Sequence, residues 1–149
     1  MKVIVNVIVK QDNKVLMVQE AFGDVKGMWN FPAGHLDEGE NIFAGAIREA
    51  KEETGYDVKL TGLINVQNSL YDNKHVIHIV FSAEIIGGEI SYDSSEIMNV
   101  EFVEIDKLLN MTDNELRGGD SRRESLVKIK NDEILPLSVV SNFDFRTNK

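Results

Sequence analysis

Residues Gly34–Tyr56 read GHLDEGENIFAGAIREAKEETGY, and this stretch predicts a helix with one strongly acidic face. At about 100° per residue, Glu49, Glu52 and Glu53 would lie within an arc of roughly 100° on the helix surface. Carboxylates that close repel one another, so we expect a positive partner for them. A hard divalent cation with oxygen ligands is the natural candidate.

The sequence also predicts where this helix begins and ends and which of its faces is buried. Asn41 suits an N-cap, and Gly55 suits the residue at which a helix ends. Arg48 precedes Glu52 by four residues, so its guanidinium is expected to hold a carboxylate in a fixed orientation. Four residues spaced as on one helix face are expected to pack against the core: Phe43, Ala46, Ile47 and Ala50.

An acidic helix face is most often simply solvated, and the spacing of the whole stretch argues against that alternative. Gly34 is followed after five residues by Glu40, and seven residues later comes the run Arg48-Glu49-Ala50-Lys51-Glu52-Glu53-Thr54-Gly55-Tyr56. This pattern resembles the Nudix box, the signature of the Nudix hydrolase family, at every defining position. The resemblance covers 23 of the 149 residues. A Trp and a Pro-x-Gly directly before the box also resemble the family pattern.

The resemblance implies an α/β/α sandwich with a mixed β-sheet, formed by a single Nudix hydrolase domain over residues 1–149. It implies a Mg²⁺ cofactor, with Mn²⁺ as a substitute. The implied metal ligands are Glu49, Glu52, Glu53, Glu40 and the carbonyl of Gly34. The implied catalytic residues are Glu53, Glu52, Arg48 and Glu96, and whether Glu53 or Glu96 is the general base stays open. Glu96 has a simpler alternative as a solvated carboxylate in a loop.

Candidates for substrate binding lie outside the acidic face. Tyr71 is a candidate for stacking on a base or ring, as are Phe22 and Trp29. Arg117 is a candidate for holding a phosphate or carboxylate. His35 and Phe31 complete the set, the first because it lies in the loop of the box. For each of these side chains, a place in the core or on the surface without function is the alternative.

Composition narrows the class of protein. The chain has 149 residues, 42% of them hydrophobic and 28% charged, which is typical of a globular domain. The absence of cysteine excludes disulfides, zinc-thiolate sites and cysteine nucleophiles. The net charge of −9 argues against extended nucleic-acid binding. Because no signal peptide or long apolar span is evident, we expect a cytoplasmic protein without a membrane partner, as a monomer or homodimer.

Patterning places the remaining elements. Glu20 to Met28 and Asn68 to Lys74 are expected to be loops, and Glu115 to Arg117 a helical turn. Asp106 is expected to cap a short helix, and two phenylalanines in the tail, Pro136 to Lys149, to return to the core. The expected strands are Val3 to Val9, Val15 to Gln19, Val58 to Gln67, His75 to Ile86 and Val100 to Ile105. The expected later helices are Lys107 to Asn110 and Ser121 to Lys130, with Leu126, Val127 and Ile129 partly buried.

The expected reaction is metal-dependent hydrolysis of a diphosphate linkage in a nucleoside di- or triphosphate or another X-linked diphosphate. The segment Trp29 to Leu36 with Leu116-Arg117 also resembles a branch of the family that acts broadly on nucleotides and on pyrimidine diphosphates. The alternatives are an ADP-ribose or nucleotide-sugar pyrophosphatase and a non-catalytic domain that senses a nucleotide. In each case the partner is a small phosphorylated molecule.

Overall fold

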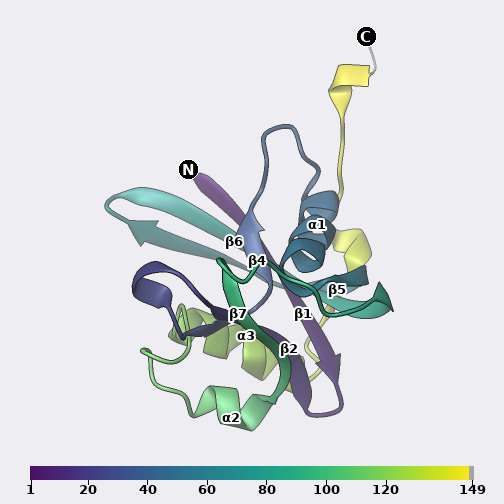
Figure 1. The fold of residues 1–149 in the computed structure, drawn as a ribbon. Coiled ribbons are helices and arrows are strands. Elements are labelled where there is room, and N and C mark those ends of the chain that lie inside the picture. The colour runs from purple at the N-terminus through teal and green to yellow at the C-terminus, as the bar shows by residue number, and fades with distance from the viewer. Residues whose placement is uncertain (148–149) are drawn as a thin grey trace.

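The computed structural model describes residues 1–147, which form a mixed β-sheet with helices on both of its faces (Figure 1). The strand order is β3-β2-β1-β6-β5-β8, with β4 paired to β1 and β7 paired to β2. The strands are β1 Lys2–Gln11, β2 Lys14–Glu20, β3 Trp29–Asn30, β4 Ala33–His35, β5 Tyr56–Tyr71, β6 Lys74–Gly88, β7 Ile97–Glu104 and β8 Leu135–Pro136. The helices are α1 Ile42–Thr54, α2 Ile105–Leu109 and α3 Asp120–Lys130, with short 3₁₀ turns η1 Gly23–Val25, η2 Leu137–Val139 and η3 Phe145–Thr147.

The centre of the sheet is the parallel pair β1 and β6, in register from Lys2 opposite Val76 to Val9 opposite Ala83. All other pairs are antiparallel, including the long hairpin of β5 and β6. β1 is rich in Val and Ile and is buried on both sides, as expected for a central strand that is covered by helices.

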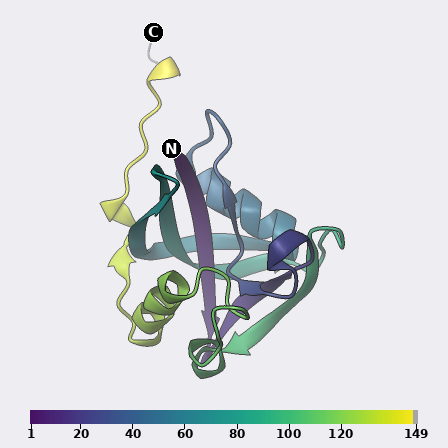
Figure 2. The same ribbon diagram turned by 90° about the vertical axis from the view of Figure 1, so that its left-hand side faces the viewer.

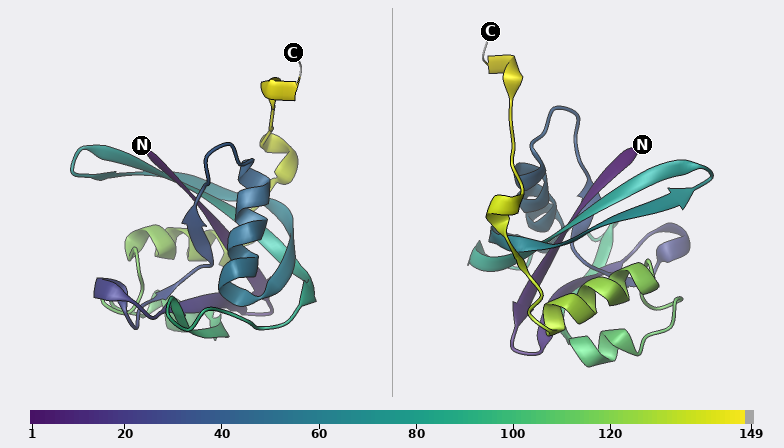
Figure 3. Two further views of the ribbon diagram at one scale, coloured as in Figure 1. Left: turned by 45° about the horizontal axis from the view of Figure 1, so that its top comes forward. Right: turned by 180° about the vertical axis from the view of Figure 1, so that it is seen from behind.

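Alternation along the strands separates two apolar clusters. Val5, Val7 and Val9 of β1 pack with Ala46 and Ala50 of α1 on one face of the sheet. On the other face, Ile8 belongs to a cluster that includes Leu126 and Ile129 of α3. Figure 2 shows the two helices on opposite sides of the strands, and the two views of Figure 3 bring α1 and then α3 to the front. The predicted α/β/α architecture is therefore confirmed.

Helix α1 has the predicted limits. The side chain of Asn41 accepts hydrogen bonds from the backbone N–H groups of Phe43 and Ala44, and Gly55 ends the helix with a φ of 84°. The prediction for Ile47 was wrong, because 39% of this residue is exposed. Ile47 lies at the edge of a narrow apolar stripe whose buried positions are taken by small residues, so the sheet is covered without it.

Several predicted boundaries were also wrong. The expected loop from Asn68 to Lys74 is mostly strand, because β5 and β6 continue to a two-residue turn at Asp72 and Asn73, both with positive φ. Such a turn matches the twist of two paired strands. Asp106 does not cap α2, which already begins at Ile105 after Glu104.

The predicted helical turn at Glu115 to Arg117 is instead a bridge between Leu116 and Trp29. Here the Trp29 N–H donates to the Glu115 carbonyl, and the Arg117 N–H donates to the Trp29 carbonyl. Helix α3 was predicted almost to the residue, although Val127 is 43% exposed.

The C-terminal segment runs past α1 and away from the sheet (Figure 1). Its two phenylalanines do not return to the core, contrary to prediction: Phe143 and Phe145 are mostly exposed and stack on each other with ring centroids 6.1 Å apart. The last two residues of the predicted tail lie outside the described part of the chain. Across residues 1–147, no helix has the length and apolar character needed to cross a membrane.

Candidate active site

Strand β4 and helix α1 lie against each other through two glutamates. The backbone N–H of Ala33 donates a hydrogen bond of 2.8 Å to Oε1 of Glu53. One step along β4, the space beside the Cα of Gly34 is filled by the carboxylate of Glu49. The Gly34 backbone thus lies directly against the acidic face, and its immediate partner is the Glu49 carboxylate.

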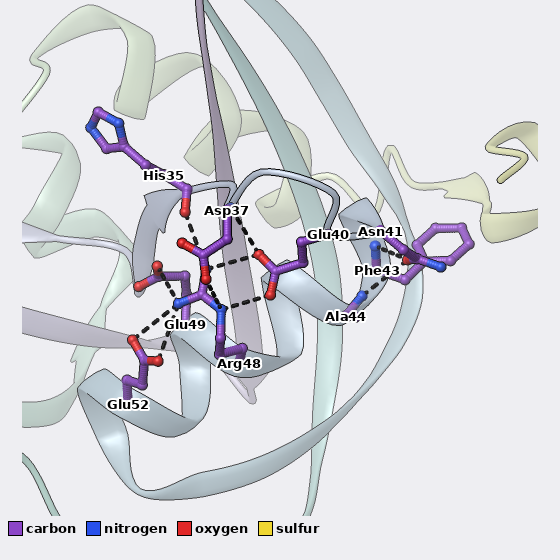
Figure 4. Close-up of polar contacts among 9 residues, drawn as sticks. All are labelled: His35, Asp37, Glu40, Asn41, Phe43, Ala44, Arg48, Glu49 and Glu52. Atoms are coloured by element: carbon purple, nitrogen blue, oxygen red, sulfur yellow. Dashed lines mark hydrogen bonds and ion pairs between the residues drawn. The ribbon is translucent and has the colours of Figure 1, made fainter. Parts of the chain in front are cut away.

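Arg48 holds three of the predicted carboxylates (Figure 4). Its Nε lies 2.7 Å from Oε2 of Glu40, and its Nη1 lies 2.8 Å from Oε1 of Glu49 and 3.1 Å from Oε2 of Glu52. Nη2 donates to the backbone carbonyl of His35, which ties the helix to β4. The predicted pairing of Arg48 with Glu52 is confirmed. The bond to Glu40 is the main reason why the pKa of the Arg48 guanidinium is raised, and it also lowers the pKa of Glu40.

Glu53 lies outside the reach of Arg48 and has the most perturbed carboxyl group of the site. Burial raises its pKa to about 8, against the effect of the Ala33 N–H, which favours the ionised form. The nearby charges of Glu20, Glu49 and Glu96 raise it further. The acidic face therefore divides into a part that is neutralised by Arg48 and a part around Glu53 where negative charges accumulate.

Glu20, at the end of β2, is a member of this cluster that sequence patterning missed. Its carboxylate accepts a hydrogen bond of 2.8 Å from Nη1 of Arg117. Burial raises the pKa of Glu20, and the Arg117 charge opposes that change. Next to Glu20, the N–H of Ala21 donates to the carbonyl of Glu96, which attaches the loop of Glu96 to the cluster. Only the sheet brings these segments together, so no local sequence signal marks Glu20.

The carboxylates of this cluster are the type of oxygen ligand that a divalent cation requires. Within residues 1–147, Oε2 of Glu49 and Oε2 of Glu53 accept no hydrogen bond, although Oε1 of each is held in place. Oxygen atoms in an anionic, partly buried place are the ligands that Mg²⁺ and Mn²⁺ prefer. As the side chains stand, no three His, Asp or Glu residues in this part of the chain are close enough together to hold an ion. Glu52 is more than half exposed and points its carboxylate to Arg48.

Three of the four predicted substrate-binding residues line one cavity of about 740 Å³: Tyr71, Arg117 and His35. The fourth, Phe31, was predicted wrongly, because it is fully buried in the apolar cluster under α3. Its position before Pro32 fixes an extended backbone but also points the ring into the core. Phe22 is 78% exposed, and Trp29 packs against the same apolar cluster as Phe31.

A sequence model of the family described as "NUDIX domain" matches residues 1–124. An ADP-ribose pyrophosphatase of Methanocaldococcus jannaschii is 34% identical over 108 residues, which cover 71% of this chain and 63% of that protein. Nudix hydrolase 6 of Arabidopsis thaliana is 35% identical over 106 residues, covering 68% of this chain and 38% of that protein. The similarity thus spans less than two thirds of the length of either relative.

Among solved structures, a NUDIX hydrolase from Nitrosomonas europaea superposes with a TM-score of 0.84. The superposition covers 95% of this chain and 97% of that one, at 23% sequence identity. At this identity the likeness establishes the fold: a mixed sheet between helices, as described above.

Proposed function

The chain belongs to the Nudix family, and on this premise we propose that it is a pyrophosphohydrolase that cleaves a diphosphate linkage with the help of Mg²⁺ or Mn²⁺. The observation that carries the proposal is the pair Glu49 and Glu53. Each has one carboxylate oxygen held by the protein and one left over, in a place where burial and neighbouring carboxylates raise the pKa of Glu53 to about 8. Because the ionised form of Glu53 is unfavourable in this place, a bound cation would stabilise it strongly.

We propose that Glu49 and Glu53 are the main ligands, with Glu52, Glu40 and the Gly34 carbonyl completing the set. A bound divalent ion would withdraw charge from the diphosphate oxygens, which otherwise resist attack by water. Arg48 acts as a positioning residue, because its guanidinium fixes Glu40, Glu49 and Glu52 relative to one another.

The general base is proposed to be Glu53 or Glu96. A base must take a proton from water at the operating pH. Burial and neighbouring carboxylates raise the pKa of Glu53 in the metal-free protein, which favours proton uptake, and a bound cation acts in the opposite direction. Glu96 is an exposed carboxylate whose charge reaches Glu53, so it can accept the same proton from the solvent side. Because Glu53 is also a proposed metal ligand, the deciding variant is Glu96→Gln. Loss of turnover with unchanged stabilisation by Mg²⁺ assigns the base to Glu96, and normal turnover assigns it to Glu53.

The proposed substrate is a nucleoside diphosphate linked to a further group, or a nucleoside triphosphate. The relative from Methanocaldococcus jannaschii is named an ADP-ribose pyrophosphatase, which makes ADP-ribose and the nucleotide sugars the first compounds to test. Pyrimidine diphosphates remain the second group. A single domain over the whole chain, a cytoplasmic location and a monomeric or homodimeric state stay predictions.

The test is a hydrolysis screen of ADP-ribose, nucleotide sugars, nucleoside triphosphates and pyrimidine diphosphates. It is run with Mg²⁺, with Mn²⁺ and with excess chelator, and phosphate and pyrophosphate are measured separately. We expect turnover of at least one class of diphosphate that stops in chelator. Full turnover in chelator would overturn the metal mechanism. Calorimetric binding of a nucleotide without hydrolysis would instead favour a sensor domain.

A further inference from the structure

The cavity lined by Tyr71, Arg117 and His35 has an excess of positive side chains, although the chain as a whole is negatively charged. The chain has a net charge of −9. Of the charged side chains around the cavity, four are basic and one is acidic. All three histidines of the sequence are also there. The basic side chains are Lys2, Lys74, Arg117 and Arg122, and the acidic one is Asp72.

This cavity adjoins the carboxylate cluster through shared structural elements. His35 lines the cavity, while Ala33 and Gly34 of the same strand contact Glu53 and Glu49. Arg117 lines it as well, and its Nη1 is bonded to Glu20 of the cluster. A molecule that places its diphosphate at the glutamates can therefore extend into the cavity.

Arg122, which sequence patterning did not single out, is the most unusual residue of the cavity. It is only 7% exposed. Its Nε donates to Oδ1 of Asn30 and its Nη1 to Oγ of Ser121, at 2.9 and 3.1 Å. Both acceptors are neutral. Across residues 1–147 no carboxylate forms an ion pair with Arg122, and its Nη2 has no acceptor. Buried charges in proteins are normally paired. The carboxylate whose charge acts on Arg122 is Glu20, and its hydrogen bond goes to Arg117, so the two guanidinium groups share one carboxylate.

The pKa values of Arg122 and His78 are both lowered, in part by the positive charges in the cavity. The pKa of Arg122 is lowered to about 10, first by burial and then by the charge of Arg117, and the charge of Glu20 opposes this change only in part. The pKa of His78 is lowered to about 4 by burial and then by Arg122 and Arg117. His78 is thus neutral, and its Nδ1 lies 3.3 Å from Nδ2 of Asn6. With Asn6 as donor, the proton of His78 is on Nε2, which makes the ring a hydrogen-bond donor.

We propose that this cavity binds a second anionic group of the substrate, a phosphoryl or carboxylate group separate from the diphosphate that is cleaved. The inference rests on the proposed function, and it narrows the substrate class to diphosphates whose X or nucleoside part carries an extra charge. The planar fork of Arg122 suits the paired oxygens of either group. An uncharged ring in the cavity would leave Arg122 unneutralised. Tyr71, 60% exposed at the edge, is available to stack on the ring that carries the anion.

The test compares compounds that differ in one anionic group. ADP-ribose is compared with its 2′-phosphate, and UDP-glucose with UDP-glucuronate, by calorimetry with Ca²⁺, another divalent ion that takes oxygen ligands, in place of Mg²⁺. The diphosphate then keeps a cation at the glutamates, and the recovered solution is assayed for cleavage so that binding is separated from turnover. We expect the more anionic member to bind about tenfold more tightly, the effect of one charge-assisted hydrogen bond. A preference confined to the first pair identifies a phosphoryl group, and one confined to the second identifies a carboxylate.

In Arg122→Gln the preference should fall to within about twofold, and Arg122→Lys should retain part of it, on the same scale of one charged hydrogen bond. Lys59→Gln is the matched control, because Lys59 is an exposed cation outside the cavity lining, and it should keep the full preference. If Arg122→Gln does not fold, Lys74→Gln at the rim should lower the preference in its place.

Two results would overturn the inference. One is equal affinity for both members of each pair, or binding of none of the four compounds. The other is a preference that survives in the Arg122 and Lys74 variants. Hydrolysis with Mg²⁺ is measured separately on the same compounds, so a protein that binds with the expected preference but cleaves nothing would contradict the proposed function and leave the anion site standing.

Discussion

The carboxylate of Glu49 occupies the space that a Cβ atom on Gly34 would need. Gly34 does not have a positive φ, so its lack of a side chain serves contact and not backbone freedom. Glu49 can lie this close to strand β4 only because residue 34 is glycine. This relationship explains the first position of the box in physical terms.

Gly34→Ala should therefore displace Glu49 and lower turnover by at least about tenfold, a loss typical of a catalytic group moved by roughly 1 Å. The control is Gly87→Ala, because a Cβ atom there would meet only Asp57 at an ordinary 3.5 Å. Steady-state kinetics with Mg²⁺, together with melting curves of both variants, measure the effect. Normal turnover in Gly34→Ala would show that Glu49 can move without loss.

Arg48→Ala removes the common partner of Glu40, Glu49 and Glu52. We expect the free energy of unfolding to fall by about 1–3 kcal/mol, the range for charged hydrogen bonds lost at partly buried groups. Turnover should also fall, because the three carboxylates are no longer held. Lys130→Ala, which breaks the exposed pair with Asp106, should cost less than about 1 kcal/mol. Urea denaturation measures both. Equal losses in the two variants would mean that Arg48 is an ordinary surface residue.

Glu53→Gln should lower turnover by at least about 10²-fold, the low end for loss of a general base. The same change removes a carboxylate that Glu20, Glu49 and Glu96 repel, so the metal-free variant should melt at the same temperature or higher at pH 8. The stabilisation by added Mg²⁺ should shrink, since it depends on binding to the folded state. Glu84→Gln, at an exposed site on β6, is the control. Near-normal turnover of Glu53→Gln would remove Glu53 from the site.

The stability of the metal-free protein should depend on pH through Glu53. Its pKa is about 8 in the folded state, against 4.5 when unperturbed. Between these values the folded protein keeps a proton that the unfolded chain has lost, so stability falls as pH rises through this window and levels off above about pH 8. The slope from this group is at most about 1.4 kcal/mol per pH unit. Melting curves in chelator from pH 5 to 9 should show this fall in wild type and not in Glu53→Gln.

The box and helix α1 could be predicted from local sequence, because helix caps and i, i+4 pairs involve residues only a few positions apart. Asn41, Gly55 and the Arg48–Glu52 pair are such cases. Features that depend on the whole sheet were not predictable in this way. Glu20 acts on Glu53 from another element and bonds to Arg117, 97 residues away, and Arg122 reaches Asn30 across 92 residues. Phe143 and Phe145 show that aromatic residues near a terminus do not by themselves indicate a core position.

The parallel pairing of β1 with β6 has a consequence for synthesis of the protein. Lys2 pairs with Val76 and Val9 with Ala83, so the central strand of the sheet finds its main partner only after the intervening residues 12–73 have been made. Until then the Val- and Ile-rich β1 can pair with β2 alone among its larger neighbours. A contact this distant is slow to form, because the intervening chain must first be closed into a loop. We therefore expect the growing chain to expose an apolar strand until β6 has been made, and such a segment is prone to aggregate.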